Sequence, residues 1–136
     1  PFLAKIQEKQ LIITADTVVW HQNQSLGKPE NAQEAKDMLN ALSNSTHEVI
    51  TAVGFLQKGS FETLCEVSKV TFGILSEPEI EHYVQTGSPL DKAGAYGIQD
   101  PFGVRHVTRI EGSYSNIIGL PVPQVLKKIQ EITVKN

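Results

Sequence analysis

With 136 residues, 40% of them hydrophobic and 20% charged, the chain has the length and composition of a single globular domain. Its formal net charge of -3 excludes the broad positive field that attracts nucleic acid, so we expect no nucleic-acid partner. The single cysteine, Cys65, excludes an internal disulfide and a cysteine-rich zinc site. We expect this thiol to be buried in a strand. These residues contain no membrane-length apolar run and no signal-peptide pattern, which predicts a cytoplasmic protein without a membrane partner.

The first apolar run along the chain, residues 11–20, is rich in β-branched side chains and predicts a buried strand. Asp16 and Thr17 interrupt this run with polar groups. Apolar side chains then recur at helical spacing over residues 31–42. Asn31, with a glutamate three residues later, has the capping-box pattern of a helix start.

The middle of the chain predicts a hairpin followed by a helix. Residues 47–57 and 61–75 are rich in strand-forming side chains and flank a short turn, which indicates two paired antiparallel strands. A second capping box begins at Ser76, so we expect a helix that runs to about Thr86. Gly87 supplies the stop signal.

The last third of the chain predicts a glycine-rich loop over residues 94–103, a strand over residues 104–110 and a final helix opened by Pro121. Strands and helices therefore alternate along the chain, which predicts the α/β class with a mixed twisted sheet and flanking helices. We expect one domain over residues 1–136. In the predicted strand, Arg105 and Arg109 would lie on the same face. We expect both side chains to be solvated at a sheet edge, and a contact with phosphate is the less common alternative.

Four segments are unusually polar or glycine-rich for their positions, namely residues 15–17, 27–29, 91–99 and 111–116. In the first of these, Asp16 interrupts an apolar strand, where an ionised carboxylate is costly unless it has a partner or a ligand. Two interpretations are about equally supported. Asp16 either accepts a hydrogen bond from a neighbouring backbone amide, or acts as a general base or as a ligand of a hard cation such as Mg²⁺.

Lysines accompany glycines in the second and third segments. Lys28 stands between Gly27 and Pro29, and Lys92 precedes a run that contains two glycines. A solvated surface lysine is the more common case. The alternative is a phosphate site, because glycines let backbone amides approach an anion closely. The phosphate-loop pattern G-x-x-x-x-G-K-[ST] is absent.

Gln99 closes the third segment. Most glutamines in such a place are surface residues, but a primary amide offers one acceptor and two donors. It could therefore match the adjacent N–H and carbonyl of uracil or thymine and discriminate against other bases. The histidines show no metal-ligand spacing.

Taken together, these segments resemble a known family. The chain contains ADTVV at residues 15–19, LGKP at 26–29, DKAGAYGIQ at 91–99, IEGSYSN at 110–116 and GLP at 119–121. These motifs resemble, in the same order, those of the Maf (septum formation inhibitor) family. The resemblance extends from about residue 11 to residue 126, and its motifs are more specific together than singly.

The resemblance implies a fold related to the inosine triphosphate pyrophosphatases, with two lobes around a cleft. It implies an enzyme that hydrolyses the nucleoside triphosphates dTTP and UTP to the monophosphate and pyrophosphate with a divalent cation, Mg²⁺ or Mn²⁺. Asp16 matches the proton acceptor and would be the metal ligand. Lys28 and Lys92 match phosphate-contacting lysines, and Thr17 and Gln99 match positions linked to base selection. The family also suggests a homodimer.

Two alternatives stay open: a purine-type (inosine triphosphate) pyrophosphatase of the same fold, and a non-catalytic nucleotide-binding regulator of septum formation and cell division. The family opens with a Ser-x-Ser-Pro-Arg-Arg loop that has no match in residues 1–10, and the only methionine is Met38. We therefore expect that an N-terminal segment is missing. Because that loop supplies arginines to the triphosphate, the chain alone would be inactive or would need a partner segment.

Overall fold

The computed structural model describes residues 10–135 of the chain. Its elements, in chain order, are β1 (Ile12–His21), β2 (Gln24–Leu26), α1 (Ala32–Leu42), β3 (Thr46–Gln57), β4 (Ser60–Phe72), α2 (Glu77–Gln85), the 3-10 helical turns η2 (Ser88–Asp91) and η3 (Ala93–Ala95), α3 (Pro101–His106), β5 (Val107–Glu111), α4 (Tyr114–Ile118) and α5 (Val122–Lys135).

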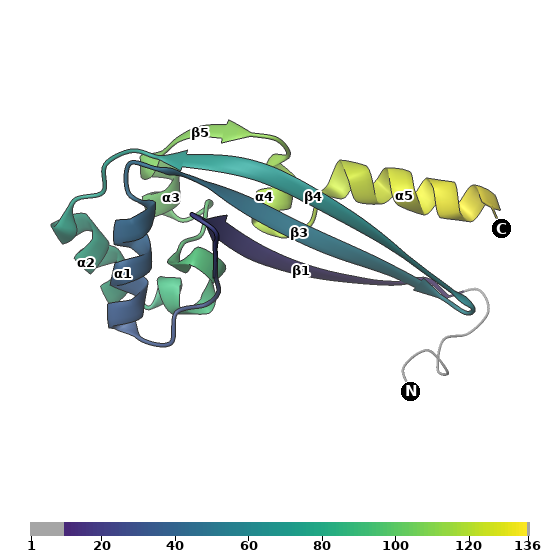
Figure 1. Ribbon diagram of the computed structural model, residues 1–136, viewed down its shortest axis with the longest axis horizontal. Helices are drawn as coiled ribbons and strands as arrows, with labels where there is room; N and C mark the ends of the chain where they lie inside the picture. Colours follow the sequence, from purple (N-terminus) through teal and green to yellow (C-terminus); the bar gives the residue numbers. More distant parts are fainter. Residues whose placement is uncertain (1–9, 136) are drawn as a thin grey trace.

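The five strands form one sheet in the order β2-β1-β3-β4-β5. The predicted α/β class, a sheet flanked by helices, is confirmed. We expected a mixed sheet, and within residues 10–135 each neighbouring pair of strands is antiparallel. Figure 1 shows β1, β3 and β4 as a long ribbon, with α1, α2 and α3 gathered at one end of it and α5 along the other.

The inner face of β3 explains how one sheet supports two groups of helices. Alternate side chains of a strand point to the same face, and the odd-numbered residues of β3 from His47 to Phe55 are all buried. His47 and Val49 lie at the end that carries α1, where the large hydrophobic core includes Val49. Val53 and Phe55 pack instead with α5 in a smaller core. We call these two ends the helical half and the distal half.

Local signals place the helix ends where the sequence predicted them. Asn31 caps α1, because its Oδ1 accepts a hydrogen bond from the Glu34 N–H at 2.8 Å. Ser76 caps α2 in the same way, through the Glu79 N–H at 3.3 Å. Gly87 follows α2 with a φ of 79°, the left-handed conformation that favours glycine.

The predicted strand over residues 104–110 is wrong in its first half. The helix α3 occupies residues 101–106, since Pro101 is preorganised for a first helical turn, and β5 begins only at Val107. Arg105 therefore lies on a helix and Arg109 on a strand, so the two do not share a strand face. Arg109 pairs with Glu111 on the same strand.

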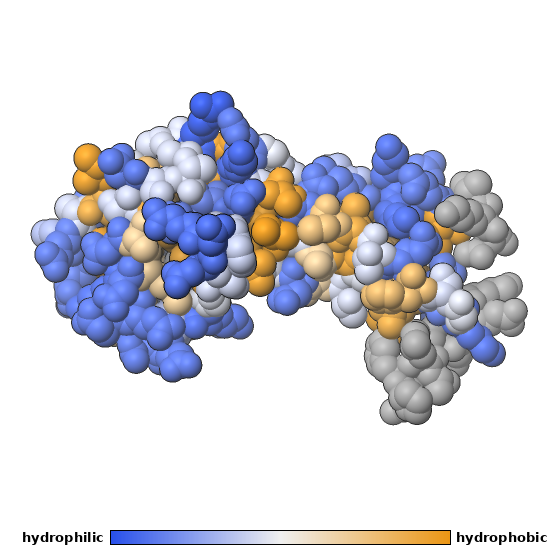
Figure 2. Space-filling model, viewed as in Figure 1, coloured by the Kyte–Doolittle hydropathy of each residue, from blue (hydrophilic) through white to orange (hydrophobic). Residues whose placement is uncertain are grey.

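Two expectations about burial are also wrong. Cys65 is exposed, because it lies on the outer face of β4 opposite the exposed Ala52. Residues 13–16 of β1 are exposed as well, although Ile13 and Ala15 are apolar. Figure 2 shows a largely hydrophilic helical half, with hydrophobic surface midway along the molecule in the region of α4 and β1. None of the helices in the described range has the length and apolarity needed to cross a membrane.

Candidate active site

A cavity of about 400 Å³ lies beside the core of the helical half. Its walls come from β1, from Val49 of β3, from the loop after β2, from the segment between η2 and α3, and from the end of α4 with Gly119. All five residues predicted from the sequence line it, namely Asp16, Thr17, Lys28, Lys92 and Gln99. The structure therefore brings together side chains that lie up to 83 positions apart in the sequence, as the difference between 99 and 16 gives.

Asp16 and Thr17 come from β1, whose backbone is fixed by pairing with β3 opposite Ala52 and Thr51. The Thr17 and Thr51 hydroxyls lie 2.9 Å apart, and the Thr51 hydroxyl donates to the Asn116 carbonyl at 3.2 Å. Asp16 is exposed, so the expected cost of burying its carboxylate does not arise. Its carboxylate lies on the cavity wall, where it is open to solvent.

The two lysine loops are held together by the backbone. The Gly94 N–H donates to the Gly27 carbonyl at 3.1 Å, so the loop that carries Lys28 is joined to the turn that follows Lys92. Gly94 has a φ of 72°, and a Cβ built on it would lie 2.9 Å from a Val19 methyl carbon. This close, left-handed turn therefore requires glycine.

The two lysine side chains have different surroundings. Lys28 is exposed, and it has no hydrogen bond or ion pair with the residues that the structure describes. Lys92 is half-buried and its Nζ donates to the Ser88 carbonyl at 3.1 Å and to the Ser88 hydroxyl at 2.7 Å. The same Nζ lies 3.8 Å from Asp100 Oδ2. One amine is thus held by the protein and the other faces solvent.

The floor of the cavity is apolar and rests on an aromatic group. Tyr96 lines the cavity, and its hydroxyl lies 2.6 Å from His47 Nε2 in the core. The Phe72 ring packs against both, with centroids 4.8 Å from Tyr96 and 5.6 Å from His47. Burial, followed by repulsion from His21, lowers the pKa of His47 to about 4. His47 is therefore neutral at physiological pH, and it supports Tyr96 from below the cavity floor.

Asn116 shows that the fourth polar segment has a structural role. Its amide nitrogen donates to the Val49 carbonyl at 3.1 Å, the Glu66 carbonyl at 3.2 Å and the Ser68 hydroxyl at 2.9 Å. These bonds fix α4 against β3 and β4. The three residues after Asn116, 117–119, then form a wall of the cavity, and among them the sequence had singled out only Gly119, in the GLP motif.

The sequence interpretation also missed Tyr83, Ser88 and Asp100. Asp100 lines the cavity, and it accepts hydrogen bonds from the hydroxyls of Tyr83 and Ser88. Partial burial alone would raise the pKa of Asp100, but the Ser88 and Tyr83 hydrogen bonds and the Lys92 ammonium together lower it below its ordinary value. A charged group directly after Gln99 was the one signal that could have indicated its role.

The residues of the cavity suit a cation that arrives with its ligand. Residues 10–135 contain no group of three or more His, Cys, Asp or Glu side chains that could hold a metal ion. Mg²⁺, however, is commonly held in proteins by one or two carboxylates together with the phosphates of a substrate. Asp16 offers such an exposed carboxylate on the cavity wall. Asp100 is less suited, because its Oδ2 already accepts two hydrogen bonds.

Two lysine amines, the Asp16 carboxylate, the Gln99 amide and an apolar floor thus line one cavity. A family model described as Maf-like protein matches residues 2–132. The chain therefore belongs to the Maf-like protein family.

Three of the similar proteins share the name dTTP/UTP pyrophosphatase. The dTTP/UTP pyrophosphatase of Flavobacterium johnsoniae is 50% identical over 124 residues, which cover 91% of this chain and 64% of that protein. The dTTP/UTP pyrophosphatase of Flavobacterium psychrophilum is 46% identical with the same coverage. That of Halalkalibacterium halodurans is 45% identical over 94% of this chain and 67% of its own length. The chain thus spans 64% to 67% of the length of these curated relatives.

Proposed function

We propose that the protein to which this chain belongs is a nucleoside triphosphate pyrophosphatase that converts dTTP and UTP to the monophosphate and pyrophosphate. The observation that carries this proposal is the single cavity shared by Asp16, Lys28, Lys92, Thr17 and Gln99. The names of the relatives support the same activity. The chain spans 64% of the length of these two relatives, so the proposal concerns the whole protein.

The phosphates would lie against the two lysines. An ammonium is a compact positive charge that binds phosphate well, and two of them can offset much of the charge of a triphosphate. Lys92 is held in place before the ligand arrives, so its charge needs little reorganisation during the reaction. Lys28 is exposed and can approach the phosphates as they bind. Both amines would stabilise the charge that develops on the departing pyrophosphate.

Asp16 would act as the general base. A water oxygen forms a bond to the α-phosphorus, the bond from that phosphorus to the bridging oxygen breaks, and Asp16 takes the proton of the water. Mg²⁺ or Mn²⁺, when bound, neutralises phosphate charge, and Asp16 is the residue that would hold it. The Asp16 carboxylate is exposed, so water can reach it.

Gln99 and Thr17 would recognise the base. Among the described residues no side chain or backbone group bonds the Gln99 amide, so its acceptor and donors can pair with the N–H and carbonyl of a pyrimidine. A base that leaves this amide unpaired would bind less well. The Thr17 hydroxyl is paired with Thr51, which fixes its direction beside the cavity. The homodimer stays a prediction from the family resemblance, and the cytoplasmic location stays a prediction from the sequence.

The test is pyrophosphate release from dTTP, UTP and inosine triphosphate by the full-length protein. We expect dTTP and UTP to be the better substrates. Asp16→Asn should lower kcat by at least about 100-fold, the size of a lost general base. Asp37→Asn, which changes an exposed carboxylate on α1, is the matched control and should leave kcat unchanged. Normal turnover by Asp16→Asn would remove Asp16 from this role, and a preference for inosine triphosphate would favour the purine-type alternative.

A further inference from the structure

We propose that Asp100 is a positioning residue of this site, which fixes the directions of the Ser88 and Tyr83 hydroxyls and through them holds Lys92 and the Gly97 amide on the cavity wall. This inference rests on the proposed function, because it concerns the same cavity. Asp100 lies outside the motifs that carry the family resemblance, so the inference adds a new residue to the site.

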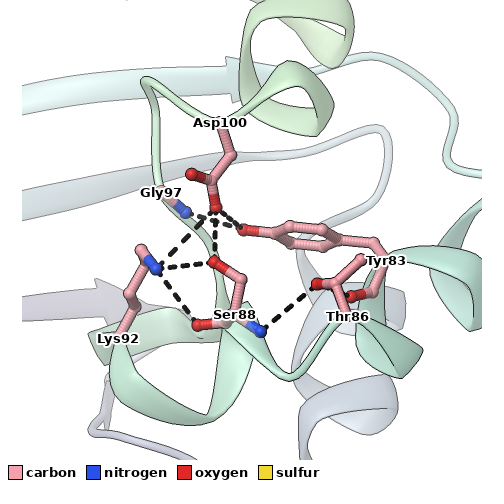
Figure 3. A network of polar contacts seen from close by, with 6 residues as sticks. All are labelled: Tyr83, Thr86, Ser88, Lys92, Gly97 and Asp100. Carbon is pink, nitrogen blue, oxygen red and sulfur yellow. Dashed lines mark hydrogen bonds and ion pairs between the residues drawn. The ribbon is translucent and has the colours of Figure 1, made fainter.

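Figure 3 shows the contacts around the carboxylate. Asp100 Oδ2 accepts a hydrogen bond from the Tyr83 hydroxyl at 2.8 Å and from the Ser88 hydroxyl at 2.8 Å. Each hydroxyl in turn accepts a hydrogen bond on its other side. The Lys92 amine donates to Ser88 Oγ at 2.7 Å, and the Gly97 N–H donates to the Tyr83 hydroxyl at 3.0 Å.

The direction of each bond follows from the groups at the two ends. An ionised carboxylate can only accept, whereas an ammonium and a backbone N–H can only donate. A hydroxyl has one proton, so the Ser88 and Tyr83 hydroxyls must both give theirs to Asp100. Their lone pairs then point to Lys92 and Gly97. If the carboxylate were removed, each hydroxyl could rotate and the amine would lose an oriented acceptor.

The protonation states that this arrangement needs are the stable ones. The pKa of Asp100 lies below its ordinary value, since the hydrogen bonds and the Lys92 ammonium outweigh the effect of partial burial. Burial raises the pKa of the Tyr83 phenol, so this group keeps its proton. The directions of the hydrogen bonds are therefore the same throughout the neutral pH range.

The network is anchored in the core and closely fitted to the loop. The Tyr83 ring stacks on Phe102, with centroids 4.2 Å apart and ring planes within 5° of parallel. A Cβ built on Gly97 would lie 2.7 Å from Lys92 Cε and 3.1 Å from Asp100 Oδ2. A side chain at this position would displace the lysine stem, which glycine lets lie against the backbone.

The consequence is a preorganised amine. Two of the three Lys92 ammonium protons are directed to Ser88, and the ion pair with Asp100 restrains the charge at 3.8 Å. A charge already in place costs no reorganisation when charge develops on the substrate, so its effect should appear in kcat more than in KM.

The kinetic test uses the full-length protein with dTTP. Asp100→Ala should lower kcat about tenfold with a smaller change in KM, and Asp100→Asn, which keeps an acceptor oxygen, should lower it less. In a Lys92→Ala background, Asp100→Ala should lower kcat clearly less than it does in the unmodified protein, because the part of its effect that acts through the amine is gone and only the Gly97 branch is left. If the two effects multiply instead, Asp100 does not act through Lys92 and the proposal is overturned. Asp37→Ala is the control.

A second readout needs no substrate. Hydrogen exchange of the Gly97 amide, followed by NMR without nucleotide, should be faster in Asp100→Ala and in Tyr83→Phe, which keeps the stacked ring. Ser88→Ala should leave the Gly97 amide unchanged, because Ser88 serves the lysine branch. Unchanged Gly97 exchange in Asp100→Ala would overturn the inference even in an active enzyme. Absence of pyrophosphate release by the unmodified protein, with the expected exchange pattern, would overturn only the proposed function.

Discussion

The helical half and the distal half share the same strands but are held together differently. In the helical half, β1, β3 and β4 pack with α1, α2 and the loops that carry the cavity, in one large core. In the distal half, the inner face of the sheet packs only with α5 and the partly buried Leu11, within residues 10–135. Asn116 and Thr51 lie between the two cores. The site is thus built where the most elements converge, which suggests that site geometry and distal packing can be disturbed separately.

The largest effects should come from one core substitution in each half. Phe72 is fully buried beside His47 and Tyr96, so Phe72→Ala should cost about 3 to 5 kcal/mol of unfolding free energy and also impair the site. Ile132→Ala in α5 should cost about 2 to 4 kcal/mol but leave kcat near that of the unmodified protein. Urea unfolding and pyrophosphate release measure the two quantities. Equal loss of kcat in both variants would show that the halves are coupled.

A pH effect should follow from the buried His47 of the helical half. The pKa of His47 is lowered from 6.5 to about 4, so the unfolded chain binds this proton more readily than the folded one. The free energy of unfolding is therefore unaffected by this group above pH 6.5, and it decreases by up to about 3 kcal/mol as the pH falls towards 4. Unfolding free energies measured across this range should show the slope. His47→Gln should remove that component, and an unchanged slope in this variant would contradict the assignment to His47.

The smallest effect is expected on the surface of the distal half. Lys128 on α5 pairs with Glu62 on β4 at 2.8 Å, and both side chains keep part of their solvent exposure. Lys128→Met, which keeps most of the apolar stem, should change the unfolding free energy by less than about 1 kcal/mol. The difference should shrink further at high salt. A cost near that of Ile132→Ala would mean that α5 is held by charge and not by its apolar face.

Local signals explain which parts of the fold the sequence could predict. The caps at Asn31 and Ser76 and the stop at Gly87 depend on neighbours within one helical turn, and all three were confirmed. The exposure of Cys65 and Asp16 was not predictable in this way. Which face of β1 and β4 is covered depends on where α4 and α5 pack, and the strand pattern itself does not give that.

The site shows the same limit. The five residues predicted for it lie in short motifs, and the structure places all of them on one cavity, while their roles stay predictions. The network around Asp100 was missed because Tyr83 and Ser88 lie 17 and 12 residues before it, and only the fold brings them together. Nothing in their local sequence distinguishes them from a core tyrosine and a loop serine.

The most direct test is a crystal structure of the full-length protein with a non-hydrolysable dUTP analogue. We expect the phosphates within hydrogen-bonding distance of the Lys28 and Lys92 amines, the base on the Gln99 amide, and the Asp16 carboxylate facing the α-phosphorus. A second cavity of about 550 Å³ lies between α2 and α3, lined by His82, Phe102 and Arg105 among others. An analogue bound there, with the four predicted side chains untouched, would contradict the assignment of the site.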